Sequence, residues 1–137
     1  LLGRRRRRVF GARRTGGGWE VFTHGGRSAT GLDAVDWARR VCDLGAGEIL
    51  LTSVDREGTG KGMDLELIQK VSAAVPIPVI VSGGVGSAQD FTDAVNIGKA
   101  DAVAMAHVLH YNHQTVAQLR EHAIAHGVPV RRFDSAA

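Results

Sequence analysis

Two sets of glycines, each placed after a short apolar run, could bind an anion. Gly58 lies in the loop that follows residues 49–51, and Gly83 and Gly84 come soon after residues 79–81. Because glycine has no Cβ atom, its backbone N–H group can approach an anion closely, and the start of a following helix adds its positive dipole end. The pattern favours a phosphate as the ligand. The alternative interpretation is that these glycines only form tight turns.

The histidines are a second candidate for chemistry. Three of them, His107, His110 and His113, recur every three residues, and His122 and His126 lie four apart. Such spacings can bind a metal ion. No carboxylate lies among the first three, so the pattern favours exposed histidines on helix surfaces, and we expect neither a metal nor another cofactor.

Segments typical of strands and helices must position these residues, and they alternate along the chain. Residues 19–23 alternate large and polar side chains as a short strand does, and the triple glycine before them predicts a hairpin. Further on, short apolar runs typical of strands buried on both faces alternate with stretches of helical periodicity. The expected order is a helix over residues 32–44, a strand at 49–51, a helix at 63–74, a strand at 78–81, a helix at 88–97, a strand at 102–105 and a last helix from 116 that is stopped by Gly127.

This order predicts an α/β fold with a parallel sheet and right-handed crossovers. Two architectures fit, an open doubly wound sheet or four of the eight units of a (β/α)₈ barrel. Residues 83–86 lack the G-x-G-x-x-G spacing of a dinucleotide fold, and no Walker sequence is present, which favours the barrel. In a barrel the glycines follow the carboxyl ends of strands, where ligands bind, and residues 106–110 could form the short extra helix of a phosphate site.

Composition and charge exclude several classes of protein. The 137 residues suit one domain, and no apolar run approaches the ~20 residues of a membrane-spanning helix, so we expect no membrane partner. Although the formal charge is +3, seven of the 17 basic residues lie within the first 14 positions. The run Arg4–Arg8 leaves open a nucleic-acid binder, but it has no interleaved aromatic residues and no nucleic-acid-binding motif, so we expect no nucleic-acid partner. The single Cys42 suits a reducing, cytoplasmic location.

Three segments resemble the cyclase subunit of imidazole glycerol phosphate synthase. Residues 47–59, with the specific string Leu-Leu-Thr-Ser-Val-Asp-Arg-Glu-Gly-Thr, and residues 79–86 resemble the sixth and seventh strand-loop segments of that family, and residues 19–26 resemble the hairpin in its long fifth loop. The likeness extends over about residues 12–132, which implies a parallel (β/α) half-barrel, units 5–8 of a TIM (β/α)₈ barrel. Residues 1–11 are then a non-homologous or damaged arginine-rich segment whose first residue is not a natural start, and residues 133–137 are a tail.

The resemblance implies a sugar-phosphate substrate and a reaction of histidine biosynthesis. That family uses ammonia, delivered by a glutaminase subunit, to convert a phosphoribulosyl aminoimidazole carboxamide intermediate to imidazole glycerol phosphate and an aminoimidazole carboxamide ribotide. Matched by position, the residues implied to bind the substrate or its phosphate are Thr52, Glu57, Gly58, Gly83, Gly84, Ala106 and His107. The family usually has Asp in place of Glu57 and Ser in place of His107. Glu48, at the start of its strand, matches a residue that gates ammonia entry.

The sequence departs from the family at Gly11, which stands where one of two catalytic aspartates is usual. The second aspartate belongs to a first half-barrel that this chain does not contain, so we expect no catalytic acid or base and no turnover by the chain alone. Residues 2–8 are not expected to form the apolar strand required before Gly11, because adjacent arginines would place charges on its buried face. The implied partners are a complementary half-barrel or a second copy of the chain. The alternative function is a non-catalytic phosphate-binding or self-assembling half-barrel.

Overall fold

The computed structural model describes residues 6–110 and 114–131. Its strands are β1 (Arg6–Thr15), β2 (Gly18–Thr23), β3 (Ser28–Asp33), β4 (Ala46–Ser53), β5 (Val79–Ser82) and β6 (Ala102–Ala104). Its helices are α1 (Ala34–Asp43), α2 (Leu65–Ala74), α3 (Ala88–Asn96), α4 (His107–His110) and α5 (Val116–Ala125). The elements follow the predicted alternation of strands and helices, preceded by the predicted hairpin.

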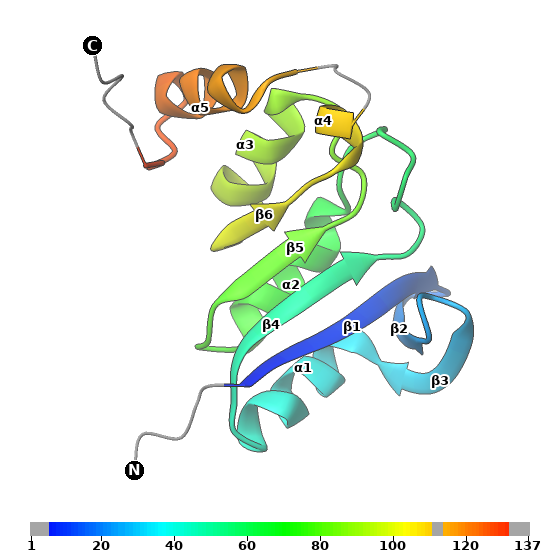
Figure 1. Ribbon diagram of the computed structural model, residues 1–137. Coiled ribbons are helices and arrows are strands. Elements are labelled where there is room, and N and C mark those ends of the chain that lie inside the picture. The colour runs from blue at the N-terminus through cyan, green and yellow to red at the C-terminus, as the bar shows by residue number, and fades with distance from the viewer. Residues whose placement is uncertain (1–5, 111–113, 132–137) are drawn as a thin grey trace.

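All six strands form one sheet in the order β3-β2-β1-β4-β5-β6 (Figure 1). The strands β1, β4, β5 and β6 run parallel to one another, whereas β1, β2 and β3 form an antiparallel meander. Helices lie in the connections between the parallel strands, as such connections require. The chain is thus a mixed α/β protein whose sheet is compatible with part of a TIM-barrel-like fold.

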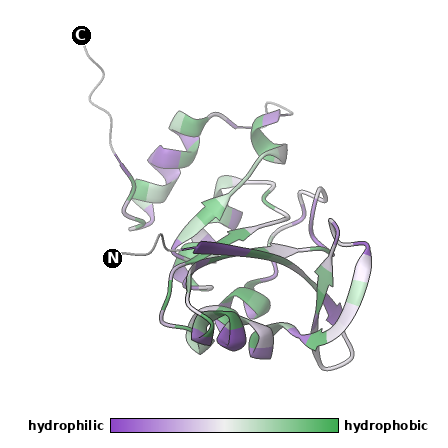
Figure 2. Ribbon diagram, turned by 60° about the horizontal axis from the view of Figure 1, so that its bottom comes forward, coloured by the Kyte–Doolittle hydropathy of each residue, from purple (hydrophilic) through white to green (hydrophobic). Residues whose placement is uncertain are grey.

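The core lies between the sheet and helices α1, α2 and α3, which cover one face of the sheet (Figure 1 and Figure 2). Ile49 and Leu51 of β4 and Val79 and Val81 of β5 belong to this core, and each is at most 1% exposed. Helix α5 packs against α3. The alternation of buried residues along these strands shows that every second side chain faces the helices.

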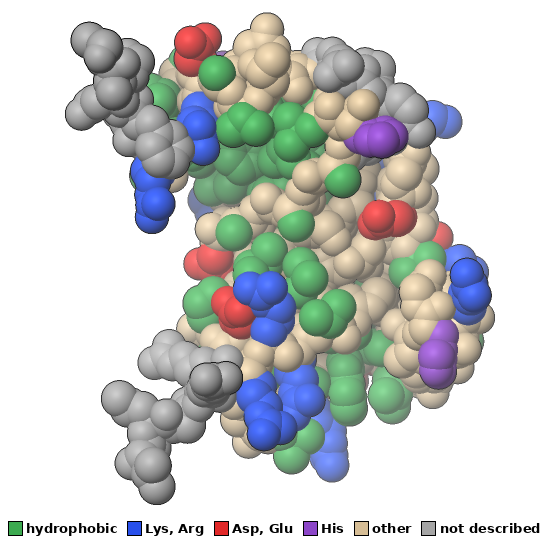
Figure 3. Space-filling view, in the orientation of Figure 1, with side chains coloured by type: hydrophobic (Ala, Val, Ile, Leu, Met, Phe, Trp, Pro, Cys, Tyr) green, Lys and Arg blue, Asp and Glu red, His purple; other side chains and the backbone are tan. Residues whose placement is uncertain are grey.

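The opposite face of the sheet is open in the described chain. On this face Leu50 and Ile80 are only half-buried, and Val9 of β1 is 65% exposed. Figure 3 looks onto this side and shows apolar side chains scattered over the sheet among polar and charged ones, with a larger apolar patch between β6 and α5. The prediction of strands buried on both faces was therefore wrong for the described residues, because their helices lie on one side only.

Side-chain caps fix where the longer helices begin. Each N-cap accepts a hydrogen bond from the backbone N–H three residues further on; these caps are Asp33, Asp64, Ser87 and Thr115. Because Asp64 is a cap, α2 begins at Leu65 and not at the expected Met63. Within the described ranges, no helix is both long enough and apolar enough to cross a membrane.

Strand β1 begins within the arginine run, contrary to the expectation that residues 2–8 cannot form a strand. Arg7 and Arg8 pair in parallel with Glu48 and Ile49 of β4. The three described arginines of this run, residues 6–8, are all exposed, so water solvates the charges that a closed core would exclude. In addition, Arg7 Nε donates a hydrogen bond to Glu48 Oε1 at 2.7 Å.

Candidate functional site

The loops that follow β4, β5 and β6 meet at the carboxyl edge of the sheet and enclose a pocket of about 240 Å³. The residues that line this pocket are Glu57, Gly58, Ser82, Gly83, Gly84, Val85, Ala104, Met105 and Ala106. Five of the residues predicted to bind substrate or phosphate therefore lie together, although they come from three separate loops; they are Glu57, Gly58, Gly83, Gly84 and Ala106. We call this space the phosphate pocket, after the ligand that the glycine pattern predicts.

The glycines of the phosphate pocket have backbone conformations that other residues rarely adopt. The φ angles of Gly58, Gly83 and Gly84 are +73°, +99° and +104°. A Cβ atom on Gly83 would lie 2.7 Å from the carbonyl oxygen of Ser53, and one on Gly84 would overlap the carbonyl oxygen of Gly62. The turns and the close packing of the loops therefore require glycine whether or not an anion binds.

Backbone N–H groups at the phosphate pocket are the candidate donors to an anion. The N–H of Gly62 is already used, since it donates to the carbonyl oxygen of Gly84 at 2.8 Å and ties the two loops together. Among the described residues, no hydrogen bond occupies the N–H of Gly58 or that of Gly84. These two groups are therefore available to an anion, which is the use that the glycine pattern predicts.

A larger cavity of about 660 Å³ adjoins the phosphate pocket. Thr52 lines this cavity, and Glu57 and Ser82 line both spaces, which therefore share a wall. The hydroxyl groups of Thr52 and Ser82 are 2.7 Å apart and form a hydrogen bond between β4 and β5. Ser82 was not among the predicted site residues. The signal for it was its position on β5, opposite Thr52 in the parallel register and on the same open face of the sheet.

Gly11 also lines the larger cavity, at the place where the resemblance puts a catalytic aspartate. It pairs with Thr52 in the parallel ladder between β1 and β4. A Cβ atom at Gly11 would lie 2.9 Å from Cγ2 of Val54, so a larger side chain would require Val54 to move. Glu57 and His24 are the titratable residues among the described side chains around this cavity.

Asp64, at the end of the loop between β4 and α2, is a buried carboxylate that the sequence reasoning missed. Its side chain is 5% exposed. It accepts hydrogen bonds from Trp19 Nε1 at 2.8 Å, from Arg14 Nη2 at 3.0 Å and from the N–H of Leu67 at 3.2 Å. Burial alone would raise the pKa of Asp64, but these donors hold the pKa below its ordinary value. Hydrogen bonds to Asp64 and Glu66 in turn raise the pKa of Arg14.

Glu48 lies near the amino end of β4, whereas Thr52 lies near its carboxyl end. The structure therefore does not bring Glu48 to the phosphate pocket. Its carboxylate forms an ion pair with Arg7 at 2.7 Å, and the two side chains are 32% and 52% exposed.

The histidine pattern does not converge on a metal site in the described part of the chain. No group of three or more His, Cys, Asp or Glu side chains there could hold a metal ion. His113 lies outside the described residues, and of His107 only the backbone, at the start of α4, is described. The rings of His122 and His126 stack on each other with their centroids 4.0 Å apart.

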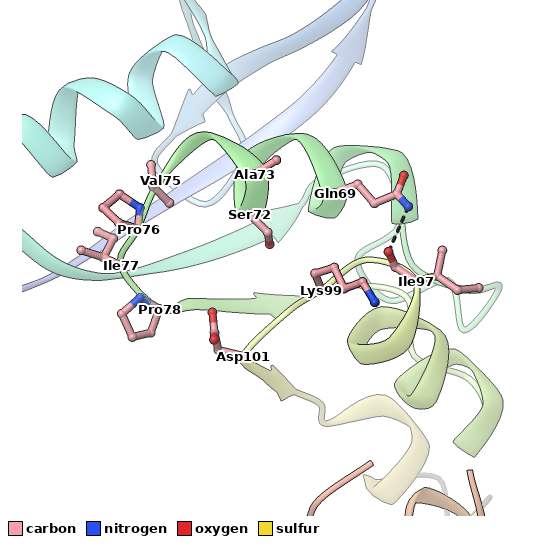
Figure 4. A pocket seen from close by; sticks show the side chains of 10 residues that line it. All are labelled: Gln69, Ser72, Ala73, Val75, Pro76, Ile77, Pro78, Ile97, Lys99 and Asp101. Atoms are coloured by element: carbon pink, nitrogen blue, oxygen red, sulfur yellow. Dashed lines mark hydrogen bonds between the residues drawn. The ribbon is translucent and has the colours of Figure 1, made fainter. Parts of the chain in front are cut away.

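A further hollow, of about 500 Å³, lies at the opposite edge of the sheet, where α2 and the connections leading into β5 and β6 meet (Figure 4). The side-chain amide of Gln69 donates to the carbonyl oxygen of Ile97 beside it, and Asp101 accepts a hydrogen bond from the N–H of Val79. Of the described side chains predicted to bind substrate, none lines this hollow.

Residues 6–115 match the family model described as histidine biosynthesis protein. The matched range begins in β1, ends at the N-cap of α5 and includes all the loops that form the phosphate pocket.

Proposed function

Because the chain belongs to the histidine biosynthesis protein family, we propose that it is the C-terminal half of the cyclase subunit of imidazole glycerol phosphate synthase, a cytoplasmic lyase. In this proposal the parallel strands β1, β4, β5 and β6 are units 5–8 of a (β/α)₈ barrel, and the phosphate pocket holds one phosphate of a sugar-phosphate substrate. The observation that carries the proposal is that three loops meet at the carboxyl edge of the sheet, where barrels bind ligands. Each of these loops contributes glycine or another small residue to the pocket.

The side chains next to the phosphate pocket suit the sugar part of such a substrate. Thr52 and Ser82 present hydroxyl groups to the adjoining cavity, which is large enough for several sugar carbons. A carboxylate beside a phosphate would repel it, so Glu57 is better used as an acceptor from sugar hydroxyl groups. The phosphate itself is then left to the backbone N–H groups of Gly58 and Gly84.

The parent reaction needs a general acid and a general base, each typically contributing 10²–10⁴-fold to the rate. Gly11 supplies no proton-transfer group at the position of one family aspartate, and the other belongs to units outside this half-barrel. The chain by itself is therefore proposed to bind ligand without turnover. Glu48, paired with Arg7, is the candidate for the ammonia gate that faces a glutaminase subunit in the complete enzyme.

The open face of the sheet supports a need for a partner. A half-barrel leaves the side chains of its inner face, such as Val9 and Leu50, without the layers that fill a closed barrel. The partner in this proposal is a complementary half-barrel or a second copy of the chain. A non-catalytic, self-assembling half-barrel that binds phosphate is the alternative, and the absence of a carboxylate at Gly11 favours it.

A pair of matched glycine variants tests the phosphate pocket. Gly58 and Gly127 have φ angles of +73° and +76°, and a Cβ atom on either would contact nothing within 4 Å. Gly58→Ala and Gly127→Ala therefore carry the same backbone strain, about 1 kcal/mol, but only the first lies at the pocket. Titration with inorganic phosphate, followed by amide NMR, is expected to show weaker binding for Gly58→Ala alone. Equal binding by both variants and the unmodified chain would contradict the proposed site.

A further inference from the structure

The loop of residues 54–64 carries Gly58 to the phosphate pocket, and Arg14 holds both of its ends. At the first end, the backbone N–H of Arg14 donates to Asp55 Oδ2 at 2.7 Å. At the last end, the guanidinium of Arg14 donates to Asp64 Oδ1 at 3.0 Å. The loop contains no helix or strand of its own, so these contacts and its packing set its position.

Arg14 is itself held in place by the hairpin of β1 and β2. Its guanidinium lies over the ring of Trp19, 4.8 Å from the centroid, and Trp19 is 4% exposed. The indole N–H of Trp19 donates to the second oxygen of Asp64 at 2.8 Å, and Arg14 Nη2 also reaches Glu66 Oε2 at 3.2 Å. The position of the guanidinium is therefore determined by a ring, a buried carboxylate and an exposed one.

The other side of the loop packs directly on the glycine segment after β5. The N–H of Gly62 donates to the carbonyl oxygen of Gly84 at 2.8 Å, and a Cβ atom on Gly86 would overlap the carbonyl oxygen of Gly60. Backbone touching backbone leaves no flexible side chain to absorb a movement. A displacement of the loop would therefore change the distance between the Gly58 and Gly84 donors.

We propose that Arg14 is a positioning residue for the phosphate pocket: it fixes the loop of residues 54–64 against residues 83–86 and so sets the spacing of the backbone donors. The inference rests on the proposed function, because it assumes that this pocket is where phosphate binds. Arg14 does not line the pocket, so it acts through the loop and not by contact with the ligand.

Three variants of the full chain test this proposal. Arg14→Gln removes the charge and the double contact with Asp64 and Glu66, whereas Arg14→Lys keeps a cation that can reach Asp64. Arg39→Gln is the matched control, since Arg39 forms an exposed ion pair with Asp36 at 3.2 Å. We expect Arg14→Gln to weaken binding of inorganic phosphate by about tenfold, Arg14→Lys to recover most of the loss, and Arg39→Gln to bind as the unmodified chain does.

Hydrogen exchange measured without phosphate tests whether Arg14 positions the loop, independently of whether the pocket binds phosphate. If Arg14 positions the loop, amides of residues 56–62 exchange faster in Arg14→Gln than in Arg39→Gln, while amides of α3 keep their protection. Should the unmodified chain fail to bind phosphate, the proposed function fails, and this exchange pattern still decides the role of Arg14. If Arg14→Gln does not fold, Trp19→Phe is expected to give the same loop pattern, because it removes the indole N–H that donates to Asp64 and keeps an aromatic ring at that position. Unchanged loop exchange in the folded variant, or unchanged phosphate affinity when the unmodified chain binds phosphate, overturns the proposal.

Discussion

The hydroxyl groups of Thr52 and Ser82 lie 2.7 Å apart at the carboxyl ends of two neighbouring parallel strands. The parallel register places the two residues opposite each other, so the pair is a direct result of strand alignment. One hydroxyl donates to the other, which leaves one O–H and several lone pairs for a ligand. In the proposed function this pair contacts a sugar hydroxyl of the substrate, and the adjoining glycines hold its phosphate.

Removing one member of this pair tests the sugar side of the site. Ser82→Ala is expected to weaken sugar-phosphate binding by about 1 kcal/mol, roughly fivefold, and inorganic phosphate binding by less. Calorimetry or amide NMR measures both affinities. Ser72→Ala is the control, because the Ser72 hydroxyl has no hydrogen-bond partner among the described residues and lies at the other hollow. Equal losses for the two ligands would argue against a sugar contact.

Neutralising Glu57 should strengthen the binding of inorganic phosphate. The carboxylate lines the phosphate pocket, so its removal in Glu57→Gln takes away a repulsion of about 1 kcal/mol or less at an exposed site. Glu121→Gln, an exposed change on α5, controls for the net charge of the chain. Titration at low ionic strength measures the effect. Weaker phosphate binding by Glu57→Gln would show that Glu57 orders the pocket instead of repelling the ligand.

The buried carboxylate of Asp64 should make the free energy of unfolding depend on pH in the acidic range. The pKa of Asp64 is lower in the folded chain than in the unfolded chain, where it is about 3.9. The contribution of Asp64 to the free energy of unfolding is therefore fully present above the unfolded pKa and is lost as pH falls through the lower folded pKa. Asp64→Asn is expected to be less stable than the unmodified chain at pH 6, with the difference shrinking below about pH 4. Urea unfolding at a series of pH values from about 2.5 to about 6 measures this difference. A constant difference across the range would contradict it; Asp36→Asn is the exposed control.

The open face of the sheet should drive association of the isolated chain. Val9 and Leu44 are both 65% exposed, but Val9 lies on the uncovered face of β1 and Leu44 at the end of α1. Val9→Lys is therefore expected to shift the chain toward monomer, and Leu44→Lys to have little effect. Sedimentation at micromolar concentration measures the distribution. A stable, monodisperse monomer of the unmodified chain would contradict the expected association.

Cyclase turnover should be absent from the unmodified chain, because Gly11 provides no acid or base. Gly11→Asp alone is expected to lower stability by about 1–3 kcal/mol through the contact with Val54, and Gly11→Asp with Val54→Ala to relieve most of that loss. With an intact N-terminal half added, only the aspartate variants should form imidazole glycerol phosphate from ammonium salts. Robust turnover by the unmodified chain would show that Gly11 is wrongly aligned.

The order of strands and helices was predictable, because apolar runs indicate the strands and helical periodicity indicates the helices. The strand β3 was not, since most of its side chains are exposed and it has no apolar alternation. At Arg6–Arg8 the opposite error occurred, since no strand was expected there but β1 includes these residues. Local composition cannot show that one face of a sheet is open. The predicted α/β class and the hairpin are confirmed, whereas the half-barrel units stay a proposal.

The glycines of the phosphate pocket were predictable because their type and place after strands are local features. Ser82 required the register between β4 and β5, which only the folded sheet provides. The network of Arg14, Trp19 and Asp64 joins residues 45 to 50 positions apart in sequence, so no spacing pattern could reveal it. The features that could not be predicted are therefore those that depend on contacts between segments distant in the sequence.

Titration of the full chain with imidazole glycerol phosphate and with its dephosphorylated form, followed by amide NMR, is the decisive test that the phosphate pocket binds a sugar phosphate. We expect saturable shifts at Gly58, Gly83, Gly84 and Ser82 with the phosphorylated ligand, and much weaker binding without the phosphate. Shifts confined to the arginines at the start of β1, or equal binding of the two ligands, would contradict it.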